Sequence, residues 1–173
     1  YWYHLGTLRS FHEANLALAS ENPPFDFSTP EGVIYKRMRY LPASRINAAR
    51  MEQCIVSDGC VIGSGTTLER CLVGIRSRIG ASCILHDTVM IGADRLETDA
   101  ERAENRTNRV PDIGVGDDCI IERAILDKDC RIGNGVRIVN RDGVQTFDGE
   151  NYVIRDGIVV LPNGAVVPDG TMI

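Results

Sequence analysis

From about residue 46 to the end of the chain, aliphatic residues recur at every sixth position. They form three runs: Val56, Ile62, Leu68, Val73, Ile79, Leu85 and Ile91; then Val115, Ile121, Leu126, Ile132 and Ile138; then Leu161, Val167 and Ile173. The step shortens to five residues from Leu68 to Val73 and from Ile121 to Leu126. An α-helix needs an apolar period of 3.6 and a plain strand a period of two. A sustained period of six is typical of the hexapeptide repeat of a parallel β-helix.

The repeat predicts an all-β fold over residues 46–173. Each hexad makes one short strand and one turn, and three hexads close one triangular coil. The aliphatic side chain points inward and stacks on its equivalents in the neighbouring coils. At about 18 residues per coil, the three runs predict roughly five coils. We expect the core to include Ile62, Ile79, Ile132 and Val167.

Before the repeat, the pattern predicts a short helix and then an extended arm. Residues 7–19 fit an amphipathic helix with Thr7 as the N-cap. Its predicted apolar stripe contains Leu8, Phe11, Asn15 and Leu18. Residues 20–31 contain three prolines and predict an extended linker, and residues 32–45 predict a strand-like arm.

Two segments interrupt the repeat. Residues 93–112 are rich in charge and lack the aliphatic period, so we expect a loop in solvent. Residues 140–157 are rich in turn signals, among them Asp142-Gly143 and Asp148-Gly149. Both segments are expected to interrupt the coils.

The cysteines follow the same repeat. Four of them stand four residues after an aliphatic position, which is the second inward-facing place of a hexad: Cys60, Cys83, Cys119 and Cys130. Cys54 precedes Cys60 by six residues, and Cys71 is one residue out of register. The sequence has no CxxC pair and no histidine at metal-ligand spacing from a cysteine. We therefore interpret the thiols as core groups in a reducing compartment rather than as zinc ligands or disulfides.

Composition narrows the function classes. No apolar run approaches the ~20 residues that a membrane span needs. A net charge of −5 and a pI near 5.2 argue against nucleic-acid binding. The chain has 17 Arg and 2 Lys, and arginine suits bidentate binding of phosphate or carboxylate. The opening YWYHL has no initiator Met and no signal-peptide pattern, as expected for the inside of a longer protein.

Few residues in the coils suggest catalysis. His86 is the one histidine of residues 46–173, and we expect it in a solvated turn. It cannot supply the three zinc ligands of a carbonic anhydrase of this fold, although an acyltransferase of this class needs one histidine as general base. Most arginines fall at outward places of the hexads: Arg76, Arg78, Arg123, Arg131 and Arg137. Arg37, Arg39 and Arg155 lie at or near the junctions of arm and coils, where a phosphate pocket is a hypothesis.

Several segments together resemble one enzyme family. YWYHLGT at 1–7 and SFHEANLAL at 10–18 resemble the segment that closes the catalytic domain of glucose-1-phosphate adenylyltransferase (ADP-glucose pyrophosphorylase). VIYKRMRYLPAS at 33–44 is similar to the stretch that leads into its β-helix. Three further segments resemble the C-terminal domain of the cyanobacterial, plant and related bacterial branch of this family: MIGADRLET at 90–98, IGVGDDCIIERAILDKDCRIGNGVRIVN at 113–140 and YVIRDGIVVLP at 152–162.

The resemblance implies that residues 1–45 are the tail of a catalytic domain, with helix and linker arm, and that residues 46–173 are a left-handed β-helix for regulation and oligomerisation. The family converts ATP and glucose 1-phosphate, with Mg²⁺, to ADP-glucose and pyrophosphate for glycogen or starch synthesis. Most of its substrate and Mg²⁺ contacts belong to an upstream domain, so this chain alone is expected to be inactive. The implied assembly is a homo- or hetero-tetramer, in a bacterial cytoplasm or a plant plastid.

Individual residues carry the resemblance further. Trp2 matches a tryptophan that lies near bound glucose, and His4 stands where the family has an aspartate ligand of the catalytic metal. Hard Mg²⁺ prefers oxygen to imidazole nitrogen, so His4 departs from the family's metal chemistry. A phosphorylated metabolite is the implied effector. Arg39 and Arg155 match basic effector positions, and Asn163 replaces a lysine of the plant branch.

Two other functions fit the repeat. One is a free-standing hexapeptide acyltransferase that uses His86 and acyl-CoA. The other is a purely structural assembly module without a ligand. The arm at 33–44 and the opening YWYHLGT favour the adenylyltransferase resemblance.

Overall fold

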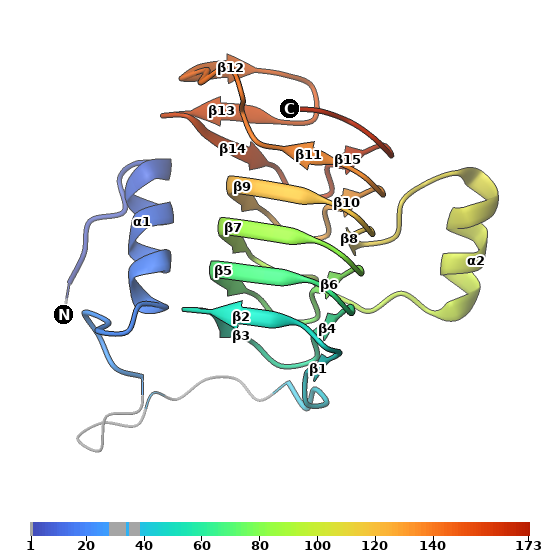
Figure 1. The fold of residues 1–173 in the computed structure, drawn as a ribbon, viewed down its shortest axis with the longest axis horizontal. Helices are drawn as coiled ribbons and strands as arrows, with labels where there is room; N and C mark the ends of the chain where they lie inside the picture. The colour runs from blue at the N-terminus through green and yellow to red at the C-terminus, as the bar shows by residue number, and fades with distance from the viewer. Residues whose placement is uncertain (1, 28–33, 35–38) are drawn as a thin grey trace.

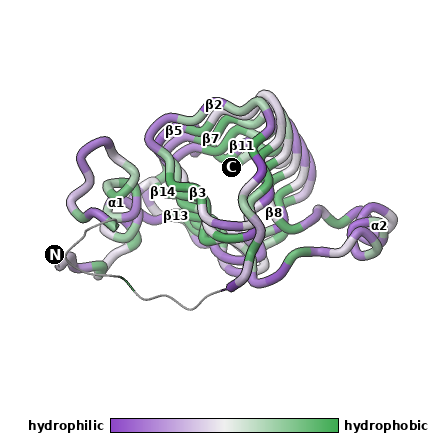
Figure 2. Tube along the Cα trace, turned by 90° about the horizontal axis from the view of Figure 1, so that it is seen from below, coloured by the Kyte–Doolittle hydropathy of each residue, from purple (hydrophilic) through white to green (hydrophobic). Residues whose placement is uncertain are grey.

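The computed structural model describes residues 2–27, 34 and 39–173, and it is a parallel β-helix with one helix on each of two opposite sides (Figures 1 and 2). The first sheet contains, in spatial order, β1 (Arg45–Ile46), β4 (Val61–Ile62), β6 (Arg78–Ile79), β8 (Gly114–Val115), β10 (Arg131–Ile132) and β15 (Val166–Val167). The second contains β12 (Thr146–Asp148), β13 (Val153–Arg155), β14 (Ile158–Leu161), β9 (Ile120–Leu126), β7 (Ile84–Met90), β5 (Thr67–Val73) and β2 (Arg50–Glu52). Beside them, β11 (Arg137–Ile138) pairs with β9, and β3 (Ile55–Val56) pairs with β5.

The three long strands of the second sheet bend at one residue, so the coils have three faces. Face 1 is the first sheet, and faces 2 and 3 are the first and second halves of β5, β7 and β9. The bend is made by Arg70, Asp87 and Arg123, whose φ angles are 51°, 46° and 47°. Gln53 has the same left-handed backbone between β2 and β3. We call this column of four residues the left-handed corner.

This single-residue corner explains the five-residue steps and corrects one predicted core position. Val73 pairs with Met90, and Met90 pairs with Leu126. Met90 is buried, whereas Ile91, the predicted inward residue, is only half-buried. The step from Leu85 to the next inward residue, Met90, is therefore five residues long, like the steps from Leu68 to Val73 and from Ile121 to Leu126. A turn of one residue removes one position from each coil at this corner.

The predicted core is confirmed. Ile62, Ile79, Ile132 and Val167 are at most 3% exposed. All six cysteines are free, and five are buried, with Cys54 half-buried. Cys71 is in register after all, because it pairs with Thr88 of the next coil and its side chain is fully buried. The thiols thus pack in the core like small apolar groups.

A column of glycines lies at the corner between faces 1 and 2, where neighbouring backbones approach closely. A Cβ on Gly80 would lie 2.6 Å from the carbonyl carbon of Gly116 in the next coil. A Cβ on Gly63 would lie 2.5 Å from the backbone of Gly80. The side chains of this corner also join the coils, since Asp117 accepts the Ala81 N–H at 2.7 Å. Glycine is required here by distance rather than by a positive φ.

The first helix, α1 (Leu8–Leu18), begins at Thr7 as predicted. The Thr7 hydroxyl accepts the Ser10 N–H at 3.0 Å, and Ser10 completes a capping box. The buried residues are His12 and Leu16, so the predicted stripe is wrong: Leu8 is 37% exposed. The sequence pattern counted histidine as polar, but His12 faces the coils.

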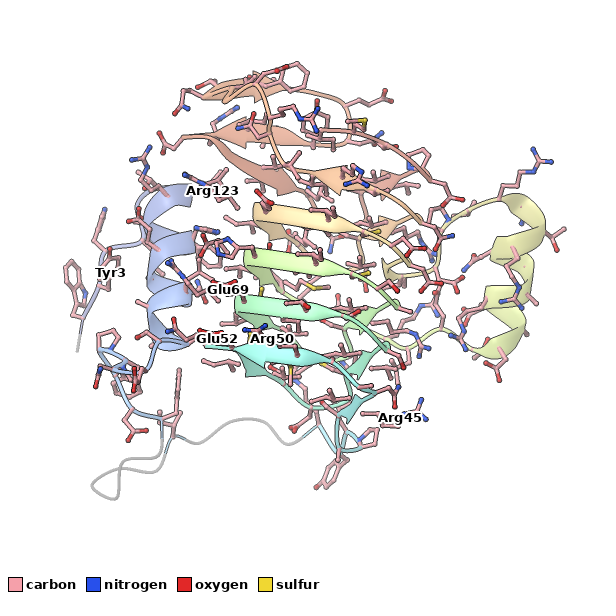
Figure 3. All side chains as sticks on the ribbon, viewed as in Figure 1. Tyr3, Arg45, Arg50, Glu52, Glu69 and Arg123 are labelled. Atoms are coloured by element: carbon pink, nitrogen blue, oxygen red, sulfur yellow. The ribbon has the colours of Figure 1, made fainter. Side chains whose placement is uncertain are left out.

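Helix α1 runs along the left-handed corner. The His12 Nε2 lies 2.7 Å from the Asp87 carbonyl oxygen, and Arg9 pairs with Asp156 at 3.4 Å. Figure 3 shows Arg123 beside the start of this helix and Glu69 further along it. The helix therefore contacts coils in the middle of the stack and at its C-terminal end rather than one coil.

The first insertion was predicted to be a loop, but the structure shows a helix in it. It contains α2 (Asp99–Asn108), which starts at Thr98 with a capping box to Glu101 and buries none of its own residues. The prediction missed the Thr-x-x-Glu signal at 98–101 because the segment lacks an apolar period. Glu97, whose side chain is 1% exposed, anchors the insertion: it pairs with Arg131 at 2.7 Å and accepts the Ile113 N–H at 2.8 Å.

The second insertion leaves the repeat as predicted but forms strands of its own. β12 pairs antiparallel with β13, and β13 pairs antiparallel with β14. Phe147 stacks on Tyr152 with ring centroids 5.1 Å apart. The predicted strand-like arm at 32–45 lies partly outside the described residues, and residues 39–44 have no regular structure.

Replacing Ile79 by alanine is expected to lower the free energy of unfolding by about 2–5 kcal/mol, because it opens a cavity between stacked coils. The matched control is Ile84→Ala, since Ile84 lies on the next strand, β7, but is 48% exposed. The control should cost about 0.5 kcal/mol or less. Chemical denaturation measures both variants, and equal costs would contradict the register.

His12 makes the stability dependent on pH. Burial lowers its pKa, although the Asp87 carbonyl and the charges of Asp87 and Glu13 act in the opposite direction, and the charge of Arg123 adds to the lowering. The unfolded chain therefore takes up the proton first as the pH falls below about 6.5, so unfolding becomes easier.

We expect the free energy of unfolding to fall between pH 7.5 and pH 5, and His12→Gln to remove part of this fall. The glutamine amide keeps a donor for the Asp87 carbonyl but does not titrate. Denaturant unfolding at both pH values measures the effect. An unchanged pH dependence in the variant would show that His12 does not contribute.

Candidate anion-binding groove

A groove runs along the corner between faces 3 and 1, where the first insertion begins. Its space is about 490 Å³. The walls are made of turn residues from successive coils and of the end of the arm: Arg39, Leu41, Ser57, Asp58, Leu72, Gly74, Ile75, Ile91, Ala93, Asp94 and Lys128. We call it the corner groove.

Positive charge gathers around one carboxylate in the corner groove. The Lys128 Nζ lies 2.7 Å from Asp94 Oδ1. Its hydrogen bond, with the charges of Lys128, Arg39 and Arg76, holds the pKa of Asp94 below its usual value. Arg76 also donates to the Ala93 carbonyl at 3.2 Å. Three cations thus act on Asp94, and they outnumber the two carboxylates of the walls, Asp58 and Asp94, which makes the groove suitable for an anion.

The coil register brings these residues together. Leu126 pairs with Leu161, so Lys128 and Asn163 hold equivalent places two residues further along neighbouring coils. The Gly164 N–H donates to the Lys128 carbonyl at 2.9 Å, which places the exposed Asn163 directly beside Lys128. The arm enters the groove because the Gly59 N–H donates to the Pro42 carbonyl at 2.9 Å. Arg39 comes from this anchored arm.

Arg155 lies elsewhere. It belongs to β13 and pairs with Ile158, at the end of β14 near the left-handed corner. Its guanidinium binds Asp148 and donates to the carbonyls of Phe147 and Ile154 at 2.9 and 2.8 Å. The structure therefore brings Asn163 toward the corner groove, which Arg39 lines, but holds Arg155 in contacts of its own. The hypothesis about Arg37 falls outside the described residues.

The other predicted site residues are not part of the corner groove. Trp2 is 82% exposed, and its ring centroid lies 6.2 Å from that of His4. His86 lies on β7, in a strand rather than the predicted turn, with Nδ1 3.1 Å from Asp87 Oδ2 and Nε2 3.5 Å from Glu69 Oε1. Lys128, Arg76 and Asp94 were not predicted as a site. Counting positions from Leu126 and Leu161 would have paired Lys128 with Asn163.

The described residues do not by themselves fit a Mg²⁺ site. Among them, no three histidine, cysteine, aspartate or glutamate side chains gather closely enough to hold a metal ion. His4 offers a single imidazole on an exposed segment.

Residues 39–172 match the family model of the GLGC left-handed parallel β-helix domain. The chain belongs to this family. The match covers the arm from Arg39 onward and every coil, so the handedness expected from the sequence is shown. The GLGC domain relates the chain to the β-helix of ADP-glucose pyrophosphorylase and implies a nucleotidyltransferase as the parent protein. Within the described part of this GLGC chain, neither helix has the length and apolar character to cross a bilayer.

Proposed function

We propose that this GLGC β-helix is the regulatory and oligomerisation part of a glucose-1-phosphate adenylyltransferase, and that its corner groove binds a phosphorylated metabolite effector. The parent reaction joins ATP and glucose 1-phosphate to give ADP-glucose and pyrophosphate. The observation that carries the effector proposal is the gathering of Arg39, Arg76 and Lys128 around Asp94.

A phosphate monoester carries about two negative charges near neutral pH and offers three acceptor oxygens. In the corner groove it competes with Asp94 for the Lys128 ammonium. Arg39 and Arg76 supply the forked donors that suit phosphate oxygens. Asn163 adds an uncharged side chain where the plant branch has a lysine. The groove therefore binds the effector by exchanging one carboxylate for a more highly charged group.

The N-terminal segment contributes to the substrate site of the parent enzyme. Exposed Trp2 presents a large apolar surface for the glucose ring. Mg²⁺ would be held mainly by residues of the catalytic domain, where it would neutralise part of the phosphate charge. His4 offers an imidazole nitrogen in place of a carboxylate oxygen, which hard Mg²⁺ disfavours.

Assembly follows from the open ends of the β-helix. The sheets end at β1 and β2 on one side of the stack and at β15 and β12 on the other, and a partner copy can pair with or cover these edge strands. We propose a homo- or hetero-tetramer. Light scattering of the chain at high concentration tests this, and a strictly monomeric mass would contradict it.

Lys128→Gln is expected to weaken the binding of fructose 6-phosphate roughly ten- to a hundredfold, because it removes one charge-assisted contact worth about 1.5–3 kcal/mol. Isothermal titration calorimetry of the chain measures the dissociation constant. The control is Arg9→Gln, which removes one exposed cation far from the groove and should change binding less than about twofold. Equal weakening in both variants would overturn the effector site.

The variant Arg155→Ala tests whether the effector binds in the corner groove or on β13. The resemblance assigns Arg155 to the effector site, whereas in the structure its guanidinium group binds the Asp148 carboxylate. If the corner groove is the site, Arg155→Ala changes fructose 6-phosphate binding much less than Lys128→Gln does. A larger loss in Arg155→Ala would place the effector on β13 instead.

Asn163→Lys is expected to tighten the same binding several-fold, because it adds a cation on the coil beside Lys128. The matched variant Asn163→Gln keeps the amide and should leave the affinity unchanged. Calorimetry at low ionic strength gives the contrast. No gain from the added lysine would show that Asn163 does not face the bound phosphate.

A further inference from the structure

A second groove lies on face 1, between the strands and the first insertion. Its space is about 710 Å³. The floor is formed by β6, β8 and β10 with the glycine corner, and the opposite wall is formed by α2 and the residues that follow it. Figure 1 shows α2 standing off the coils on this side. We call it the arginine groove.

Four arginines line the arginine groove from both walls. Arg78 rises from β6, and α2 with its C-cap supplies Arg102, Arg106 and Arg109. Within the described residues, Arg78, Arg106 and Arg109 have no carboxylate within 4.0 Å. Arg102 pairs with exposed Asp99 at 2.9 Å, but its buried Nε has no hydrogen-bond partner there.

Like charges act on Arg78. Burial lowers its pKa and the charges of Arg102 and Arg45 lower it further, whereas the charges of Asp112 and Asp99 act in the opposite direction. Figure 3 shows Arg45 at β1, on the side of the molecule that α2 occupies. Arginine stays protonated in proteins, so the repulsion is not relieved by loss of a proton. An anion between the two walls would relieve it.

The carboxylates of the arginine groove are already engaged. Asp112 accepts the Asn105 side-chain amide at 2.9 Å. Asp117 and Asp169 accept backbone N–H groups of neighbouring coils, each at 2.7 Å. They bind the wall and the coils together and, in the part of the chain that the structure describes, form no ion pair with the lining arginines within 4.0 Å. Within the described residues, the guanidinium groups of Arg78, Arg106 and Arg109 therefore form no ion pair, and the one partner of Arg102 is the exposed Asp99.

The wall that carries the arginines is held in place. Burial raises the pKa of Glu97, but the Ile113 N–H and the Asn105 and Arg131 side chains outweigh it, so its pKa lies below the usual value. Arg131 also donates to the Pro111 carbonyl at 2.7 Å. A wall fixed before binding avoids part of the ordering cost that a flexible loop would incur.

We propose that the arginine groove binds a diphosphate-containing ligand, at a site separate from the corner groove. Four guanidinium forks on two facing walls exceed what one phosphate group engages bidentately, and they suit two linked phosphates. The space between the walls is larger than the corner groove, and Val61, Val110 and Pro111 offer apolar surface beside the cations for an organic part.

Inorganic pyrophosphate is the probe, titrated into the full chain by calorimetry at low ionic strength. The double variant Arg102→Gln/Arg106→Gln is expected to weaken pyrophosphate binding at least tenfold. The control Arg9→Gln/Arg141→Gln removes the same charge from exposed positions outside this groove and should change binding less than about twofold. Equal losses in both double variants, or no loss in the first, would overturn the proposal.

Two further variants separate this site from the corner groove and from misfolding. Lys128→Gln should leave most pyrophosphate binding intact, and Arg102→Gln/Arg106→Gln should leave fructose 6-phosphate binding intact. Glu97→Gln should weaken pyrophosphate binding while the circular dichroism of the coils is unchanged, because it loosens only the wall. If Lys128→Gln alone abolished the binding of both fructose 6-phosphate and pyrophosphate, pyrophosphate would bind in the corner groove and the second site would be overturned.

Discussion

Hydrogen bonding in register between successive coils is the constraint on which the rest of this protein depends. Each long strand pairs residue for residue with the next, as at Leu68, Leu85 and Ile121. Because the backbones are locked at this spacing, a side chain at one place in the hexad must stack on the same place above and below. The interior therefore accepts only aliphatic, thiol and small residues in columns, and the outer corners become columns as well.

The two grooves follow from those outer columns. A side chain at an outer corner lies beside the equivalent side chain of the next coil, as Lys128 lies beside Asn163. The insertion at 93–112 then turns one corner into two surfaces: its first residues bring Asp94 to one groove, and α2 forms the wall of the other. A regular solenoid thus acquires irregular binding surfaces where its repeat is interrupted.

The repeat was sufficient to predict the coils and their core, because neither an α-helix nor a plain strand produces an apolar period of six. It failed by one residue at Met90, since a one-residue corner in the left-handed region leaves only a shortened step in the sequence. Helix α2 was missed although Thr98 and Glu101 signal its start. Of the corner groove, Arg39 and the neighbouring Asn163 were predicted as effector residues. Lys128 and Asp94 were missed, because Arg39 and Asp94 lie outside the repeat and no period relates them to Lys128.

The position of α1 has a consequence for how the fold comes apart. A solenoid whose coils touch only their neighbours unfolds coil by coil from its ends. Helix α1 instead contacts Asp87 in the middle of the stack and Asp156 near its far end, and it shares a pocket with Gln53 of the first coil. It links coils that are distant along the axis. The helix therefore makes loss of an end coil costly to the others and turns a sequence of local openings into one cooperative transition.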